Sequence, residues 1–165
     1  LATAISERAG FFDAAFDIAE FDPETALQIG PLAIRFERSR HHVPAWGMTI
    51  VAPDGARLAY TGDTGPSDSM VEFVHGADLL LVEAALRSAS EDDPARGHLT
   101  AEEAIDLAHG ADVGAALIVH YDPSRRAEIE AMCDGVGPWM RPAVAGLTMT
   151  VSPRTREAGS RVRST

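Results

Sequence analysis

The chain has 165 residues, of which 45% are hydrophobic and 24% charged, so it can form one compact domain with a packed core. Its 25 Asp and Glu residues against 14 Lys and Arg residues leave a net charge of −11, which argues against a protein that coats nucleic acid, since phosphate binding needs a basic face. A small anionic ligand, held by local groups or by metal ions, is compatible with that charge.

The first part of the chain has the pattern of antiparallel β structure. Apolar residues at helical spacing predict an amphipathic helix over residues 4–18. Alternating apolar and polar residues predict strands over 32–37, 46–52 and 57–61. Residues 53–56 read Pro-Asp-Gly-Ala, a tight-turn sequence, so the second and third of these strands should form a hairpin.

After residue 61 helices alternate with apolar strands, which is typical of βαβ units in an α/β fold with mixed strand directions. His-Gly-Ala-Asp closes two of the helices, where glycine should form a left-handed cap and His75 and His109 suit the last turn. We expect helices over 67–74, 100–109 and 126–133, strands over 79–82 and 116–119, a turn over 135–138 and a final hairpin over 144–151. Residues 1–151 would then form one domain and 152–165 a polar, flexible tail.

The single cysteine, Cys133, excludes an internal disulfide and a Cys-rich zinc module; we expect it in the core. No apolar run reaches the roughly 20 residues that span a bilayer, and no signal peptide is recognisable. We therefore expect a cytoplasmic protein without a membrane partner.

Four polar residues follow predicted strands or precede a helix, where ligands gather in α/β proteins. Asp63 lies in Gly62-Asp63-Thr64, Glu83 follows an apolar strand, His98 precedes a helix with a Thr-x-x-Glu capping box, and His120 ends another apolar strand. Carboxylate and imidazole are metal ligands and acid–base groups. Each residue also has an ordinary structural explanation: a turn carboxylate, a strand-end glutamate that reaches solvent, a loop histidine and a structural histidine at a strand end. Of His41 and His42, adjacent in an extended segment and so facing opposite ways, at most one can join a site.

The order of these residues resembles the metallo-β-lactamase fold, specifically its ribonuclease Z-like and cyclic phosphodiesterase branch. The Gly-Asp-Thr sequence, Glu83-Ala84, Gly97-His98 and the strand-end His120 match the pattern of that branch, with Leu99 in place of its usual Ser. His41, followed after four residues by Trp46-Gly47, is similar to another family segment. The likeness covers about residues 32–151.

The resemblance implies an αββα sandwich with a site for two divalent metal ions, zinc or else manganese or iron. Asp63 and His120 would be metal ligands, and His98 and Glu83 catalytic. His41 and Thr64 would bind substrate. Two metal ions would hold hydroxide and clamp the phosphoryl oxygens.

The family's His-x-His-x-Asp-His sequence and its following lone His have no match in this chain. A catalytic zinc needs about three protein ligands. We therefore interpret the chain as the C-terminal half or more of its domain, with the N-terminal half of the same domain as its partner. The alternative is a degenerate, inactive relative.

The predicted function is metal-dependent hydrolysis of a small anionic phosphodiester, such as a cyclic nucleotide. Precursor tRNA is a less favoured substrate, and a large nucleic acid partner is not expected, because no projecting basic arm precedes Asp63. Hydrolysis of a lactone, thioester or β-lactam is one alternative, and a non-catalytic interaction module on a decayed fold is another. A homodimer is compatible with the sequence.

Overall fold

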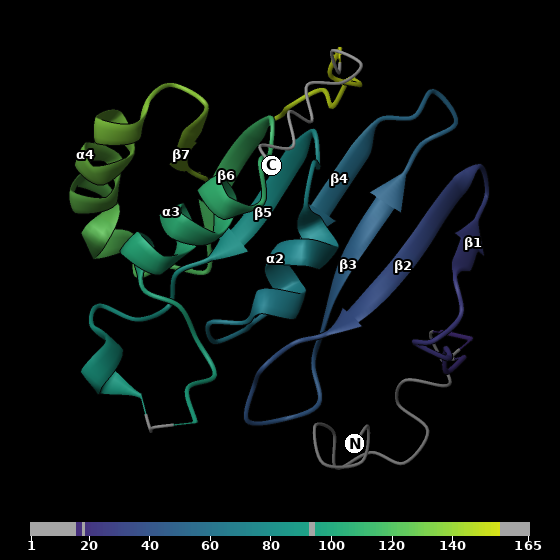
Figure 1. Cartoon of the computed structure of the whole chain (residues 1–165), viewed down its shortest axis with the longest axis horizontal. Coiled ribbons are helices and arrows are strands. Elements are labelled where there is room, and N and C mark those ends of the chain that lie inside the picture. The colour runs from purple at the N-terminus through teal and green to yellow at the C-terminus, as the bar shows by residue number, and fades with distance from the viewer. Residues whose placement is uncertain (1–15, 18, 93–94, 156–165) are drawn as a thin grey trace, which may run out of the picture.

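The computed structural model describes residues 16–17, 19–92 and 95–155, and these residues form a seven-stranded sheet with helices in front of it (Figure 1). Strand order follows the chain. The strands are β1 (Leu27–Ile29), β2 (Leu32–Arg38), β3 (Trp46–Val51), β4 (Arg57–Tyr60), β5 (Leu79–Glu83), β6 (Ala115–Val119) and β7 (Met140–Pro142). The helices are α2 (Asp68–Val74), α3 (Ala101–Gly110) and α4 (Arg126–Val136), and the 3-10 turns are η1 (Ala89–Glu91) and η2 (Pro123–Arg125).

The antiparallel part of the prediction is confirmed. Strands β1 to β4 pair antiparallel in sequence. The turn between β3 and β4 has Gly55 at φ +89° and an Asp54 carboxylate that accepts from Ala56 N at 3.0 Å, as its sequence predicts. Strand β1 was not predicted, because three residues are too short to show an alternating pattern.

The βαβ units are also confirmed. Strands β4, β5, β6 and β7 pair parallel, and α2, α3 and α4 form the connections between them. Because parallel strands run in one direction, the carboxyl ends of β4, β5 and β6 lie at the same edge of the sheet. The residues of the candidate site lie at that edge.

The two faces of the sheet differ in burial. Ala59, Leu80 and Ile118 are fully buried in one core cluster with α-helical residues. On the other face, a row of apolar side chains from β3, β4 and β5 is only partly buried. It includes Met48, Ile50, Leu58, Tyr60 and Leu81. One sheet and one helical layer are two layers of the expected αββα sandwich. Packing of an N-terminal half against the apolar row stays a prediction.

The predicted final hairpin over 144–151 is wrong. The last strand is β7, which pairs parallel to β6, and residues 143–155 form no strand. Alternating apolar residues produce a strand only where another strand offers unpaired backbone groups. Ala143 N donates to Ile118 O at 2.8 Å, and Leu147 N then donates to Val144 O at 3.1 Å in a local turn.

The two His-Gly-Ala-Asp segments meet the C-terminal segment at the opposite edge of the sheet. Gly76 has the predicted left-handed φ of +71°, but after α3 it is Asp112, at +48°, and not Gly110, that adopts this conformation. Arg154 N donates to Asp78 Oδ1 at 2.8 Å, and the Arg154 guanidinium donates to Asp112 O at 2.6 Å. Within the expected flexible tail, Arg154 is thus hydrogen-bonded to the domain.

The other outcomes concern single segments. Cys133 is buried in the core, as predicted. The predicted helix over 4–18 lies almost wholly outside the described residues. Among the helices that the structure describes, none is long and apolar enough to cross a membrane. The expected cytoplasmic location stays a prediction.

Candidate functional site

Asp63 lies in the loop that follows β4. Gly62 has φ +62°, and a Cβ at that position would lie 2.8 Å from Trp46 O, so the close turn requires glycine. The turn carries the Asp63 carboxylate to the edge of the sheet, where Oδ1 lies 2.9 Å from His120 Nδ1. The Asp63 side chain is 35% exposed, so a ligand can reach it.

Glu83 is the last residue of β5, and its side chain is completely buried. Its carboxylate has three donors: Oε1 accepts from Thr64 N at 3.0 Å and lies 2.9 Å from His98 Nδ1, and Oε2 accepts from Ala85 N at 2.8 Å. A buried carboxylate is stable only when its oxygens are hydrogen-bonded. Glu83 therefore does not reach solvent, and it joins two loops of the candidate site.

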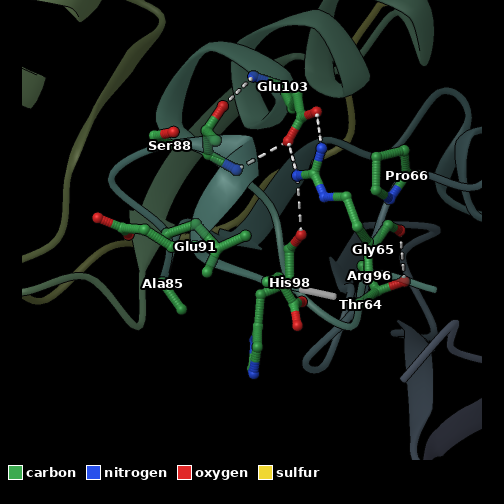
Figure 2. A network of polar contacts seen from close by, with 12 residues as sticks. Thr64, Gly65, Pro66, Ala85, Ser88, Glu91, Arg96, His98 and Glu103 are labelled. Carbon is green, nitrogen blue, oxygen red and sulfur yellow. Dashed lines mark hydrogen bonds and ion pairs between the residues drawn. The ribbon is translucent and has the colours of Figure 1, made fainter. Parts of the chain in front are cut away.

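His98 lies just before α3, and hydrogen bonds from the capping box and from Arg96 hold the backbone around it. Thr100 and Glu103 form the predicted capping box, with Glu103 N donating to Thr100 Oγ1 at 3.3 Å and Thr100 N donating to Glu103 Oε2 at 2.9 Å. The Arg96 guanidinium lies between the Glu103 carboxylate and the carbonyl of His98, to which it donates at 3.2 Å (Figure 2). The His98 imidazole points away from Glu103 (Figure 2), so this network fixes the backbone and leaves the ring at the site.

His120 follows β6 directly and has φ +48°, a left-handed conformation that is uncommon for a residue with a side chain. Its side chain is 48% exposed. Its ring centroid lies 5.5 Å from that of His98. Strained backbone of this kind is concentrated at functional sites, and here it directs the imidazole toward Asp63.

His41 and His42 both contact the loop of His98. His41 Nδ1 lies 2.9 Å from Gly97 O, and the ring centroids of His41 and His98 are 4.8 Å apart. His42 Nε2 lies 2.9 Å from Asp92 Oδ1. The prediction that the two rings face opposite ways is wrong, because residues 41–43 form bends and not an extended strand.

Thr64 was expected to bind substrate, but its side chain is fully buried. Its hydroxyl accepts from Arg40 N at 3.2 Å and donates to Gly65 O at 2.9 Å, and its backbone N donates to Glu83. In this structure Thr64 positions Glu83 and offers no exposed hydroxyl to a ligand.

Two groups of side chains among the described residues could hold a metal ion. One consists of His41, Asp63 and His98, and the other of Glu83, His98 and His120; within each group the ligand atoms lie within 4.8 Å of one another. Three imidazole and carboxylate ligands are what a catalytic zinc needs, and the same atoms suit manganese or iron. Because both Glu83 oxygens already accept hydrogen bonds, the group around Asp63 fits a cation better. The family resemblance predicts His41 as a substrate-binding residue, whereas the structure places it among the candidate metal ligands.

The electrostatic environment also suits a cation. Burial raises the pKa of the Tyr60 hydroxyl at the end of β4, and the charges of Asp63 and Glu83 raise it further. The part of this rise that Asp63 and Glu83 cause reflects their negative charges, which disfavour a further anion near the Tyr60 hydroxyl. The end of β4 therefore carries a negative potential, which attracts a positive ion.

A pocket of about 470 Å³ adjoins His120. Its wall is mostly apolar, and Arg126 at the start of α4 supplies a positive charge at its rim. The Arg126 side chain is 53% exposed and its guanidinium lies 3.8 Å from Glu130. The other lining residues are Val119, Tyr121, Pro123, Ala143, Val144 and Ala145.

Comparison with known proteins identifies the family of this chain. A family model described as the beta-lactamase superfamily domain matches residues 3–121. An uncharacterised protein of Mycobacterium leprae is 35% identical over 144 residues, which are 86% of this chain and 50% of that protein. A ribonuclease Z of Methanothermobacter thermautotrophicus is 40% identical over 77 residues, 46% of this chain and 25% of the relative.

Among solved structures, a metallo-beta-lactamase fold protein is similar to this chain. The crystal structure of the metallo-beta-lactamase fold protein YhfI from Bacillus subtilis superimposes with a TM-score of 0.68 and 28% identity, covering 77% of this chain and 52% of YhfI. The chain thus spans about half the length of the curated relatives that it matches over most of its own length.

Proposed function

Because the chain belongs to the beta-lactamase superfamily domain family, we propose that it forms part of a metal-dependent hydrolase that cleaves phosphodiester bonds. The observation that carries this proposal is the convergence of two pairs at one sheet edge. Asp63 contacts His120, Glu83 contacts His98, and the rings of His98 and His120 have centroids 5.5 Å apart.

The metallo-β-lactamase fold implies divalent metal binding, and we propose that Asp63 and His120 supply ligands here. Within the group of His41, Asp63 and His98, the first two would bind metal, and His98 would act on the substrate. Zinc, manganese and iron all suit these ligands. Divalent ions at such a site lower the pKa of bound water and offset negative charge on phosphoryl oxygens.

Glu83 and His98 would transfer the proton that the leaving oxygen needs. A carboxylate only accepts, so the 2.9 Å contact with Glu83 Oε1 places a hydrogen on His98 Nδ1. The other nitrogen, Nε2, would then act on the substrate: a protonated ring can give its proton to the leaving oxygen, and a neutral ring can accept a proton. Glu83 stabilises the protonated ring, as a carboxylate does beside a catalytic histidine.

The substrate that we propose is small. A net charge of −11 disfavours a long polyanion, whereas the 470 Å³ pocket beside His120 falls in the size range of small-molecule sites. Arg126 at its rim could bind a second phosphate oxygen, because a guanidinium matches phosphate geometry. A cyclic nucleotide or a short phosphodiester fits this description better than precursor tRNA.

The alternatives predict other substrates or none. Hydrolysis of a lactone, thioester or β-lactam could also use a histidine held by a buried glutamate, but Glu83 and Gly97-His98 match the pattern of the phosphodiesterase branch. A non-catalytic interaction module would not explain why the ligand atoms of His41, Asp63 and His98 remain within 4.8 Å of one another.

The test is an assay of the intact natural protein with zinc, manganese or iron. Substrates are a cyclic nucleotide, bis(p-nitrophenyl) phosphate, precursor tRNA, a lactone, a thioester and a β-lactam. We expect turnover of the small phosphodiesters with little salt dependence, whereas binding of a long nucleic acid would weaken by about 10³-fold or more between about 50 and 200 mM salt. Activity on the lactone, the thioester or the β-lactam alone, or on none of these compounds, would contradict the proposal.

A further inference from the structure

Asp92 links two parts of the chain beside the site, and it is not one of the metal ligands considered above. Its Oδ1 lies 2.9 Å from His42 Nε2, and its Oδ2 accepts from Gly97 N at 2.6 Å. The Asp92 side chain is only 11% exposed. Hydrogen bonds to a carboxylate at these distances are among the stronger ones in proteins.

Both ends of the Gly97 residue take part in this arrangement. While its N–H donates to Asp92, its carbonyl lies 2.9 Å from His41 Nδ1. A carbonyl oxygen only accepts, so Nδ1 of His41 must carry the hydrogen, and Nε2 keeps the lone pair that a metal ion requires. Ligating histidines usually have their other ring nitrogen held in this way.

Gly97 also allows the close approach of both rings. A Cβ on this residue would lie 2.6 Å from His42 Cδ2 and 2.8 Å from His41 Nδ1. Any other residue would push at least one imidazole away. The position of the Gly97 backbone therefore determines where His41 lies.

We propose that Asp92 and His42 are positioning residues: together they hold the Gly97 backbone, and through it they fix the tautomer and direction of His41. His42 Nε2 fixes one oxygen of Asp92, and the other oxygen holds Gly97. The chain of contacts runs from His42 through Asp92 and Gly97 to His41. The inference deepens the proposed function and depends on it only in assigning Nε2 of His41 to a metal ion.

The test reads the tautomer of His41 directly. Long-range ¹H–¹⁵N spectra of the intact, metal-free protein should show His41 with hydrogen on Nδ1. In Asp92→Ala this preference should be lost, and competition with a chelator should show zinc affinity lowered by about 10- to 100-fold. Asp92→Asn should restore most of both, because its amide oxygen still accepts from Gly97 N.

Glu91→Ala is the matched control. Glu91 lies in the same loop and its carboxylate accepts from Arg87 N at 2.8 Å, but this contact does not involve Gly97. An unchanged His41 tautomer and zinc affinity in Asp92→Ala, or equal losses in Glu91→Ala, would overturn the proposal. If Asp92→Ala does not fold, His42→Leu decides, with a smaller loss of zinc affinity in the same direction expected and none contradicting the proposal. Neither readout uses a substrate, so absent phosphodiester hydrolysis would sink the proposed function alone.

Discussion

The Asp63 carboxylate and the His120 imidazole approach to 2.9 Å although they follow β4 and β6, which are separated in the sheet by β5. The parallel direction of the three strands brings their carboxyl ends to one edge, and the left-handed backbone of His120 turns its ring toward Asp63. Topology thus assembles the site, and local backbone conformation completes it.

The buried Glu83 should affect catalysis more than stability. In Glu83→Gln one of the three groups that donate to the carboxylate would face an amide NH₂, which costs about 1–3 kcal/mol of folding free energy. His98 would also lose its charged partner, and kcat for a phosphodiester should fall by about 100-fold.

Glu72→Gln, on the exposed surface of α2, is the control for Glu83→Gln, and it should change neither kcat nor the melting temperature. A kcat within about threefold of the wild-type value in Glu83→Gln would mean that Glu83 is structural only.

A second prediction follows from the lack of room for a side chain at Gly97. In Gly97→Ala the added methyl group would lie 2.6–2.8 Å from atoms of His41 and His42. The rings must move, and we expect zinc content in the purified protein to fall, with a loss of stability of about 1–3 kcal/mol from overpacking.

Gly135→Ala provides the comparison for Gly97→Ala, because a Cβ on Gly135 has no neighbour within 4 Å. Elemental analysis measures the zinc content of both variants, and thermal unfolding measures their stability. Equal zinc contents in the two variants would show that the His41 and His42 positions are unimportant for metal binding.

Arg126 should affect substrate binding. Arg126→Gln removes the positive charge at the rim of the pocket beside His120, so KM for a small phosphodiester should rise by about 10-fold or less, with kcat little changed. Arg141→Gln, at an exposed position of β7 outside the pocket, should leave KM unchanged. Steady-state kinetics on both variants distinguish a subsite from a general charge effect, which would raise KM equally in the two.

The Glu103 carboxylate predicts a pH dependence of stability. Partial burial favours the neutral acid, but the hydrogen bonds from Arg96 and from Thr100, with the charge of Arg96, outweigh it and hold the pKa of Glu103 below its ordinary value of 4.5. A carboxyl with a lowered pKa stabilises the fold at pH values above 4.5, and this contribution is lost as the pH falls through the lowered pKa.

Glu103→Gln should therefore be less stable than the wild type at pH 7, and the difference should shrink below pH 4.5. Urea unfolding at a series of pH values measures it, with Glu102→Gln, an exposed neighbour, as the control. A difference that does not vary with pH would contradict the ion pair with Arg96.

Much of the fold could be predicted from local patterns. The alternation over 32–37, the Asp54-Gly55 turn and the Thr100–Glu103 capping box each involve residues near one another in sequence, and all three are confirmed. The final hairpin was wrong because pairing partners depend on the whole sheet. The three residues of β1 carry too little pattern to predict.

The site was less predictable because its contacts join distant segments. Asp63, Glu83, His98 and His120 were recognised as candidates from strand ends and a family resemblance, but the burial of Thr64 depends on how three loops pack. The contact between Asp92 and Gly97 had no sequence signal beyond an acidic residue in a polar loop. The distance between His41 and Asp63 likewise depends on the bends at residues 41–43.

The central claim, that Asp63 and its neighbours bind metal for phosphodiester hydrolysis, is tested most directly by Asp63→Ala in the intact protein. Bound metal and hydrolysis of bis(p-nitrophenyl) phosphate are measured on the same preparation, with circular dichroism to verify folding. We predict loss of metal and a fall in turnover of at least about 10³-fold in a protein that stays folded. Wild-type turnover in the folded variant would contradict the account.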